Sequence, residues 1–246
     1  MRGWWREISG LILPVSCGGC GGPRAELCEE CCAQLLGGTP RRVRPAPEPA
    51  GLPVVHAAAA YEGAVRSVLL AHKERGALGL AGALGKALAG AVRAGAGRAG
   101  GDGPLLLVPV PSARRAVAAR GHDPTRRIAL AAAGELRRGA TGAQVAAVLR
   151  QRRPVADQAG LGARQRQVNL AGALEVVPGG ERLLGAGRVV LVDDLLTTGA
   201  SLAEAARAIG AAGGAADGRA AAVSGAGQAA VVAVSPVAFE INRNSW

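Results

Sequence analysis

The residues best suited to chemistry stand in one run, Val189–Ser201, which reads VVLVDDLLTTGAS. Its first four residues are apolar and predict a buried strand, which Asp193 and Asp194 follow directly. After Leu195 and Leu196, small and hydroxyl-bearing residues lead into a helical pattern. Ligands of parallel sheets bind outside the carboxyl ends of the strands, which is where this turn falls. The run therefore indicates a ligand-binding loop.

The turn is suited to a phosphate group. Free backbone N–H groups at a helix start attract an anion, and the hydroxyls of Thr197, Thr198 and Ser201 are further donors. Gly199 lets the backbone close around the ligand. Ser201 also has the capping-box spacing to Glu204, so it has two candidate roles, helix cap and phosphate donor.

The presence of two carboxylates beside a phosphate site has to be explained, because carboxylates repel a phosphate. Carboxylates accept hydrogen bonds from adjacent hydroxyls, so a sugar diol on the same ligand would explain Asp193 and Asp194. The alternative is an ordinary strand–turn–helix with Asp residues at the turn. The chain has no Gly-x-x-x-x-Gly-Lys-Ser/Thr run, and Gly225-x-Gly227-x-x-Ala230 only imitates a dinucleotide fingerprint.

All five cysteines fall between Cys17 and Cys32. Two Cys-x-x-Cys pairs can close a tetrahedral thiolate site, and such clustering in a reducing compartment favours metal over disulfides. We expect Cys17, Cys20, Cys28 and Cys31 to hold a structural Zn²⁺, because four thiolates leave no open coordination position. Cys32 is an alternative to Cys31. The other interpretation is free thiols on an unstructured segment.

The elements that position these residues alternate between strand and helix. Strands are expected at Val54–Tyr61, Leu105–Val110, Val145–Arg150, Val189–Val192, Arg219–Ser224 and Ala229–Val234. Helices are expected at Arg2–Leu13, Ala64–Lys73, Leu78–Val92, Pro124–Arg138 and Ser201–Ala212, the fourth capped by Asp123. The polar stretch Arg152–Asn169 is expected to be a mobile loop with one helical turn. This order predicts an α/β fold with a mostly parallel sheet flanked by helices.

Residues 37–53 are rich in Pro, Gly and Arg and are expected to link two units. The first unit, 1–36, holds an N-terminal helix and the four-cysteine zinc module, and the second, 54–246, is the α/β domain. No stretch approaches the roughly twenty apolar residues that span a bilayer. The apolar run 10–15 is also too short for a signal-peptide core. We expect a cytoplasmic protein without a membrane span.

The net charge of +11 invites a nucleic-acid interpretation. The basic residues are almost all Arg, with Lys73 and Lys86 the two lysines, and they are scattered along the chain. Aromatic residues for base stacking are not interleaved with them. This pattern is typical of genomic base composition, and nucleic acid as the direct ligand stays open.

The run Val189–Ser201 resembles the signature of type I phosphoribosyltransferases for 5-phosphoribosyl-1-diphosphate (PRPP). The resemblance implies a type I phosphoribosyltransferase fold, with Asp193 and Asp194 as catalytic residues on the ribose 2- and 3-hydroxyls. It also implies Mg²⁺ bridging pyrophosphate and ribose, and electrostatic stabilisation of an oxocarbenium-like state. The residues implied to bind the PRPP 5-phosphate are Leu195, Leu196, Thr197, Thr198, Gly199, Ala200 and Ser201.

Most of the chain is similar to the ComF (competence protein F, or GntX-like) family. The matches are the two Cys-x-x-Cys pairs, Tyr61-Glu62-Gly63, Arg66, Lys73-x-Arg75-Gly76, Val108–Ser112, Arg115, Arg120-Gly121, Gln158, Leu161, Arg166 and Asn169. The resemblance implies a pyrophosphate loop containing Pro111, Ser112, Arg115 and Arg120. It implies a flexible loop with Gln158, Arg166 and Asn169 that closes over PRPP. The alternatives are a solvated helix face and a disordered surface loop.

The resemblance implies two functions from different classes. The first is an enzyme that transfers phosphoribose from PRPP to an unidentified acceptor. The second is a non-catalytic PRPP-sensing or single-stranded-DNA-handling protein of the DNA uptake machinery, with competence proteins as partners. A regulator of nucleotide salvage is a third, less supported interpretation.

Overall fold

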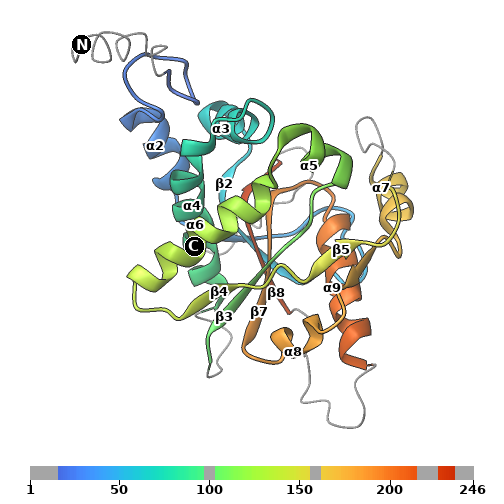
Figure 1. Ribbon diagram of the computed structural model, residues 1–246. Helices are drawn as coiled ribbons and strands as arrows, with labels where there is room; N and C mark the ends of the chain where they lie inside the picture. Colours follow the sequence, from blue (N-terminus) through green and yellow to red (C-terminus); the bar gives the residue numbers. More distant parts are fainter. Residues whose placement is uncertain (1–15, 97–102, 156–161, 215–226, 236–246) are drawn as a thin grey trace, which may run out of the picture.

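A computed structural model describes residues 16–96, 103–155, 162–214 and 227–235 (Figure 1). Its centre is a six-stranded sheet with strand order β1-β2-β8-β7-β3-β4. Strand β1 is antiparallel to β2, and the other neighbours are parallel. The strands are β1 (Arg41–Val43), β2 (Val54–Ala60), β3 (Leu105–Pro109), β4 (Ala143–Val145), β7 (Arg188–Leu196) and β8 (Gln228–Val234). The predicted α/β fold with a mostly parallel sheet is confirmed.

Helices cover both faces of this sheet (Figure 1). The helices α3 (Gly63–Glu74), α4 (Ala81–Ala96) and α6 (Pro124–Arg138) pack on one face through Val68, Leu88 and Ile128. The opposite face is covered by α8 (Gly180–Leu184) and α9 (Ala200–Gly214), with Leu184 and Leu202 in its core. Within the described residues, no helix combines the length and apolar character needed to cross a bilayer.

Local sequence accounts for several of these boundaries. The run Leu105–Pro109 is buried along its whole length, as a parallel strand covered on both faces should be. Helix α6 begins as predicted, because the Asp123 side chain accepts a hydrogen bond of 3.1 Å from the Arg126 N–H. Short helix α5 (Arg114–Arg120) ends at Gly121, whose φ of 74° is left-handed.

Other boundaries differ from the prediction. The predicted strand Val145–Arg150 is wrong, because the chain turns at Ala146, where the Val148 N–H donates to the Ala146 carbonyl. The chain then leaves the main sheet, and β5 (Leu149–Gln151) pairs with β6 (Leu174–Val176) in a separate antiparallel ribbon. The predicted loop Arg152–Asn169 holds all but the last residue of helix α7 (Ala163–Leu170). The sequence did not predict this helix because its apolar residues lack a helical periodicity. The expected helix Arg2–Leu13 and strand Arg219–Ser224 lie outside the described residues.

The proline-rich residues 37–53 contribute to the sheet. Arg41–Val43 pairs with β2 as an edge strand. The chain then reaches the turn after β7, where a Cβ placed on Gly199 would lie 3.2 Å from Pro49 and 3.0 Å from Leu52. Helix α2 (Glu29–Leu36) and the 3₁₀ turn η1 (Leu78–Leu80) complete the described elements.

Gly85 lies where α4 crosses α6, and it tests this packing. A Cβ placed there would lie 2.8 Å from the backbone nitrogen of Ala132, so the helix backbones would have to separate. We predict that Gly85→Ala lowers the free energy of unfolding by about 1–3 kcal/mol, measured by urea denaturation.

Gly210→Ala in α9 is the matched control, because a Cβ there meets nothing within 4 Å. It should raise the free energy of unfolding by about 0.5–1 kcal/mol through helix propensity. Equal effects of the two substitutions would contradict a close α4–α6 crossing.

Candidate functional site

The strand order creates a switch point between β7 and β3. Strand β3 leads through α6 to β4 on one side, and β7 leads through α9 to β8 on the other. Helices α6 and α9 lie on opposite faces of the sheet, so the two connections diverge at the carboxyl ends of adjacent strands (Figure 1). Open α/β sheets bind their ligands at such a point.

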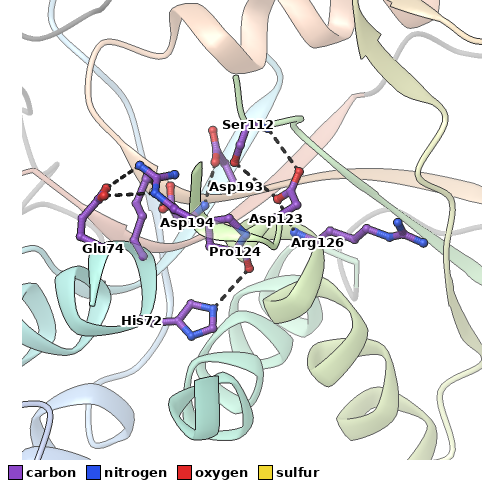
Figure 2. A network of polar contacts seen from close by, with 10 residues as sticks. His72, Glu74, Ser112, Asp123, Pro124, Arg126, Asp193 and Asp194 are labelled. Atoms are coloured by element: carbon purple, nitrogen blue, oxygen red, sulfur yellow. Dashed lines mark hydrogen bonds and ion pairs between the residues drawn. The ribbon is translucent and has the colours of Figure 1, made fainter. Parts of the chain in front are cut away.

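The two acids lie at this point, within β7 rather than after it. Asp194 is buried, Asp193 is half-buried, and the Asp194 N–H donates to Asp193 Oδ1 at 2.8 Å. Lys73, from the last turn of α3, reaches them, and its Nζ lies 2.7 Å from Asp194 Oδ2. Figure 2 shows Asp193 and Asp194 side by side in this polar network. A cation therefore sits directly against the acidic pair.

The surroundings shift the pKa values of the two acids in opposite directions. Burial raises the pKa of Asp193 well above its ordinary value, and the neighbouring Asp194 raises it further. Burial acts in the same direction on Asp194, but Lys73 outweighs it and lowers the pKa of that carboxyl. Burial would lower the pKa of Lys73, but Asp194 outweighs it and raises that pKa. Asp194 is therefore the ionised member, and Asp193 the one that retains a proton more readily.

The predicted phosphate turn follows at once. Strand β7 runs to Leu196, so only residues 197–199 form the turn, and Leu195 and Leu196 belong to the strand. Gly199 has a φ of 76°, a left-handed conformation that favours glycine. Its carbonyl accepts the first helical bond of α9, from Ala203 N–H at 2.9 Å. The N-terminus of a 15-residue helix therefore begins directly at this turn.

The side chains of the turn differ in exposure. Thr197, Thr198 and Ser201 are half-buried, so their hydroxyls can reach a ligand, whereas Leu196 and Ala200 are buried and offer only backbone groups. Of the predicted phosphate-binding residues, the backbone of the turn and of the α9 start and the side chains of these three remain suited to that role, whereas Leu195 and Leu196 pair with β8 within the sheet.

Glu204 has a different role from the predicted capping box. Its buried carboxylate accepts the Leu174 N–H at 2.9 Å and pairs with Arg207 at 2.7 Å. Burial would raise the pKa of Glu204, but Arg207 and the backbone N–H groups of Leu174 and Gly172 together outweigh it and lower that pKa. Glu204 therefore fixes the β5–β6 ribbon to α9, a long-range role that local spacing could not reveal.

The predicted pyrophosphate-loop residues follow β3, the strand beside β7. Ser112 lies close to the acids in Figure 2, and its hydroxyl donates to Asp123 Oδ1 at 3.4 Å. Arg120 forms two hydrogen bonds with Glu74, of 2.8 and 3.1 Å. Pro111 is half-buried after the strand, while Arg115 is exposed on α5. Ser112 thus lies near the acidic pair, and Arg120 lies close enough to Lys73 for the two charges to interact.

The predicted flexible-loop residues are on a separate arm. Arg166 and Asn169 lie on α7, which packs against α9, and both are half-buried. The Asn169 carbonyl accepts a hydrogen bond of 2.9 Å from Arg153. Gln158 lies outside the described residues. Closure of this arm over the acids stays a prediction.

Sequence reasoning missed Lys73 as a site residue. It stands 121 positions before Asp194, and only the packing of α3 against the sheet brings the two together. Two signals were available: Lys73 belongs to the family-like run Lys73-x-Arg75-Gly76, and it is one of two lysines in an Arg-rich chain.

The four predicted metal ligands form a cluster. The sulfurs of Cys17, Cys20, Cys28 and Cys31 all lie within 4.8 Å of one another, and Cys20 and Cys28 are 3.7 Å apart. Tetrahedral zinc, with Zn–S bonds of about 2.3 Å, separates its sulfurs by about 3.8 Å. These residues could hold a metal ion such as zinc. Cys31 rather than Cys32 completes the set.

Backbone groups prepare one of these sulfurs for metal. Cys17 is buried, which would raise the pKa of its thiol, but N–H groups of Cys28 and Gly19 donate to its sulfur at 3.3 and 3.4 Å. Together with bonds from the Cys20 N–H and the Cys28 side chain, they outweigh burial and lower the pKa of Cys17 to about 6. A thiolate is the metal-binding form, so the backbone favours coordination before an ion arrives.

The cysteine cluster is joined to α3. Gln34 Oε1, on α2, accepts the Ala64 N–H at the start of α3 at 3.3 Å, and Cys31 packs against Ala64. The other end of α3 carries Lys73 and Glu74. One helix thus contacts the cysteine cluster at its first turn and the acidic site at its last.

No protein-family model matches this chain, and comparison with curated proteins likewise finds no match.

The cysteine cluster predicts one equivalent of bound metal per chain. Cys17→Ser should lose that metal and lower the midpoint of thermal unfolding, because binding energy of a structural ion is folding energy. Cys32→Ser, the matched control, should keep the bound metal and the unaltered thermal midpoint. Metal content by mass spectrometry and unfolding by circular dichroism give the answer. Equal metal loss in the two variants would contradict the assignment.

The acidic pair predicts a pH-dependent stability. The pKa of Asp193 is raised in the folded state, so its ionisation costs stability above that pKa, and the cost vanishes at low pH. Asp193→Asn should therefore raise the thermal midpoint at pH 8. The gain should shrink as pH falls toward the ordinary Asp pKa of 3.8. A gain that is constant across pH would contradict this electrostatic origin.

Proposed function

We propose that the chain binds PRPP at the carboxyl ends of β7 and β3. The observation that carries this proposal is the adjacency of two chemistries on one strand. Asp193 and Asp194 can accept hydrogen bonds from a diol, and the glycine-bearing turn 197–199 with the α9 N-terminus can hold a phosphate. A phosphorylated ribose offers both groups a few bonds apart. This supports the type I phosphoribosyltransferase resemblance.

Each part of the ligand has residues suited to it. The 5-phosphate would bind the backbone N–H groups of the turn and the hydroxyls of Thr197, Thr198 and Ser201. The ribose hydroxyls would bind the acidic pair. The diphosphate would extend toward Ser112, which Figure 2 shows near the acids, and toward Arg120, whose charge acts on Lys73. Arg120 is suited to a diphosphate because its guanidinium can donate two parallel bonds.

We further propose phosphoribosyl transfer to an unidentified acceptor. In this reaction the bond from ribose C1 to pyrophosphate breaks, and a bond from C1 to the acceptor forms. Mg²⁺, when bound with PRPP, would neutralise charge on the departing pyrophosphate. The ionised Asp194 would stabilise positive charge that develops on the ribose ring. The arm of β5, β6 and α7, fixed to α9 through Glu204, would exclude water from the site.

The non-catalytic alternative uses the same contacts. A PRPP sensor, or a protein that handles single-stranded DNA with competence proteins, would bind PRPP without releasing pyrophosphate. That alternative rests on the sequence resemblance alone, so pyrophosphate release is the observation that separates the two functions.

Isothermal titration with PRPP and Mg²⁺ tests the proposed function. We expect a single site per chain. We expect Asp194→Ala to weaken PRPP binding about tenfold or more, because hydrogen bonds to a buried charged group are lost. Its metal content should not change, since the cysteine cluster is untouched.

Glu181→Ala on α8 is the control for loss of an acidic side chain and should bind PRPP as the unaltered protein does. No PRPP binding by the unaltered protein, or full binding by Asp194→Ala, would refute the proposed site.

A further inference from the structure

The ion pair between Lys73 and Asp194 is the feature of the site that its proposed ligand does not explain. Lys73 comes from a different layer of the fold, and its Nζ lies 2.7 Å from a carboxylate whose side chain is 7% exposed. Lys73 itself is 35% exposed. The Nζ atom therefore contacts the acid, while part of the Lys73 side chain is exposed to solvent or a ligand.

The ion pair between Lys73 and Asp194 affects how the site can receive a negatively charged ligand. A phosphorylated sugar brings negative charge to a site that already holds two carboxyl groups. Bare carboxylates would repel it, and proteins commonly remove such repulsion with a divalent cation. Here an ammonium of the chain itself already offsets Asp194. Among the described residues, Asp193 from β7 and Arg120 from α5 also act on the charge of Lys73, and Glu74 holds Arg120.

Stability is a poor reason for this pair. Taking two opposite charges out of water costs nearly as much as their attraction returns, so apolar replacements of buried pairs are often neutral. The pair nevertheless stands at the carboxyl edge of the sheet, where the ligand is expected. Both ends of α3 are also held by side chains, Gln34 at its start and Arg120 at its end, which fixes the position of Lys73.

We propose that Lys73 determines the ligand specificity of this site: its ammonium offsets Asp194, so the acidic pair receives the hydroxyls of a phosphorylated sugar without a divalent metal. The proposal rests on the proposed function and adds a residue and a metal requirement to it. Mg²⁺ is then needed for the diphosphate of PRPP and not for the ribose phosphate.

Ribose 5-phosphate is the probe, because it carries the phosphate and the diol without the diphosphate. Its affinity is measured by isothermal titration in EDTA and again in Mg²⁺. The unaltered protein should bind it equally in both. Lys73→Met should lose about tenfold or more in EDTA, since Asp194 is left as an unpaired charge, and Mg²⁺ should restore part of the loss. Lys73→Arg should retain most of the affinity.

Lys86→Met is the matched control, because Lys86 is the other lysine and is exposed on α4. Equal binding by the unaltered protein and Lys73→Met in EDTA would overturn the role of Lys73 while leaving the proposed function intact. The role of Lys73 would also be overturned if ribose 5-phosphate binding by the unaltered protein and by Lys73→Met depended equally on Mg²⁺. Absence of ribose 5-phosphate binding by the unaltered protein would refute the proposed function itself.

A second measurement observes the Lys73 ammonium directly. Reductive methylation with ¹³C-formaldehyde labels the two lysines and the N-terminal amine and keeps their charge. Each labelled amine then gives its own NMR signal. Ribose 5-phosphate should shift the Lys73 signal and leave that of Lys86 in place. The pKa of Lys73 should fall in Asp194→Asn. A Lys73 signal that neither the ligand nor Asp194→Asn changes would overturn the proposal.

Discussion

Two adjacent carboxyl groups in a central strand of the sheet are the constraint on which the site depends. Strand β7 lies inside the sheet, paired with β3 up to Val192 and with β8 through Leu196, and it leaves Asp194 buried and Asp193 half-buried. Burial of two like charges is costly, and two features of the fold reduce that cost. Lys73 neutralises Asp194 through a direct ion pair, and the pKa of Asp193 rises so that its charge is more easily lost. The result is a polar site without a large excess of negative charge.

Helix α3 connects this site to the rest of the molecule. Its first turn is capped by Gln34 from the cysteine module, and its last turn supplies Lys73 to the acidic pair and Glu74 to Arg120. The module therefore contributes to the position of a site residue at the far end of the helix. A metal held by the four cysteines would stabilise that contact, since structural ions contribute their binding energy to folding.

Local pattern predicted the parts of the fold that local physics determines. The apolar runs indicated β3, β7 and β8, the Asp123-Pro124 pair indicated the start of α6, and the Cys-x-x-Cys spacing indicated the sulfur cluster. The parts that it missed depend on distant contacts. The role of Glu204 requires Leu174, the edge strand Arg41–Val43 requires β2, and Lys73 requires Asp194. Such pairings leave no mark at short spacing, so only the folded chain reveals them.

The defining property proposed for this site is that the acidic pair binds a diol beside a bound phosphate. The most direct test compares ribose 5-phosphate with 2-deoxyribose 5-phosphate, by isothermal titration of the same protein. The two ligands share the phosphate and differ by one hydroxyl, so the ratio of their affinities isolates the diol. We predict about tenfold tighter binding of ribose 5-phosphate, because the deoxy sugar leaves a carboxylate oxygen without its hydrogen bond. Equal affinity for the two sugars would contradict the account.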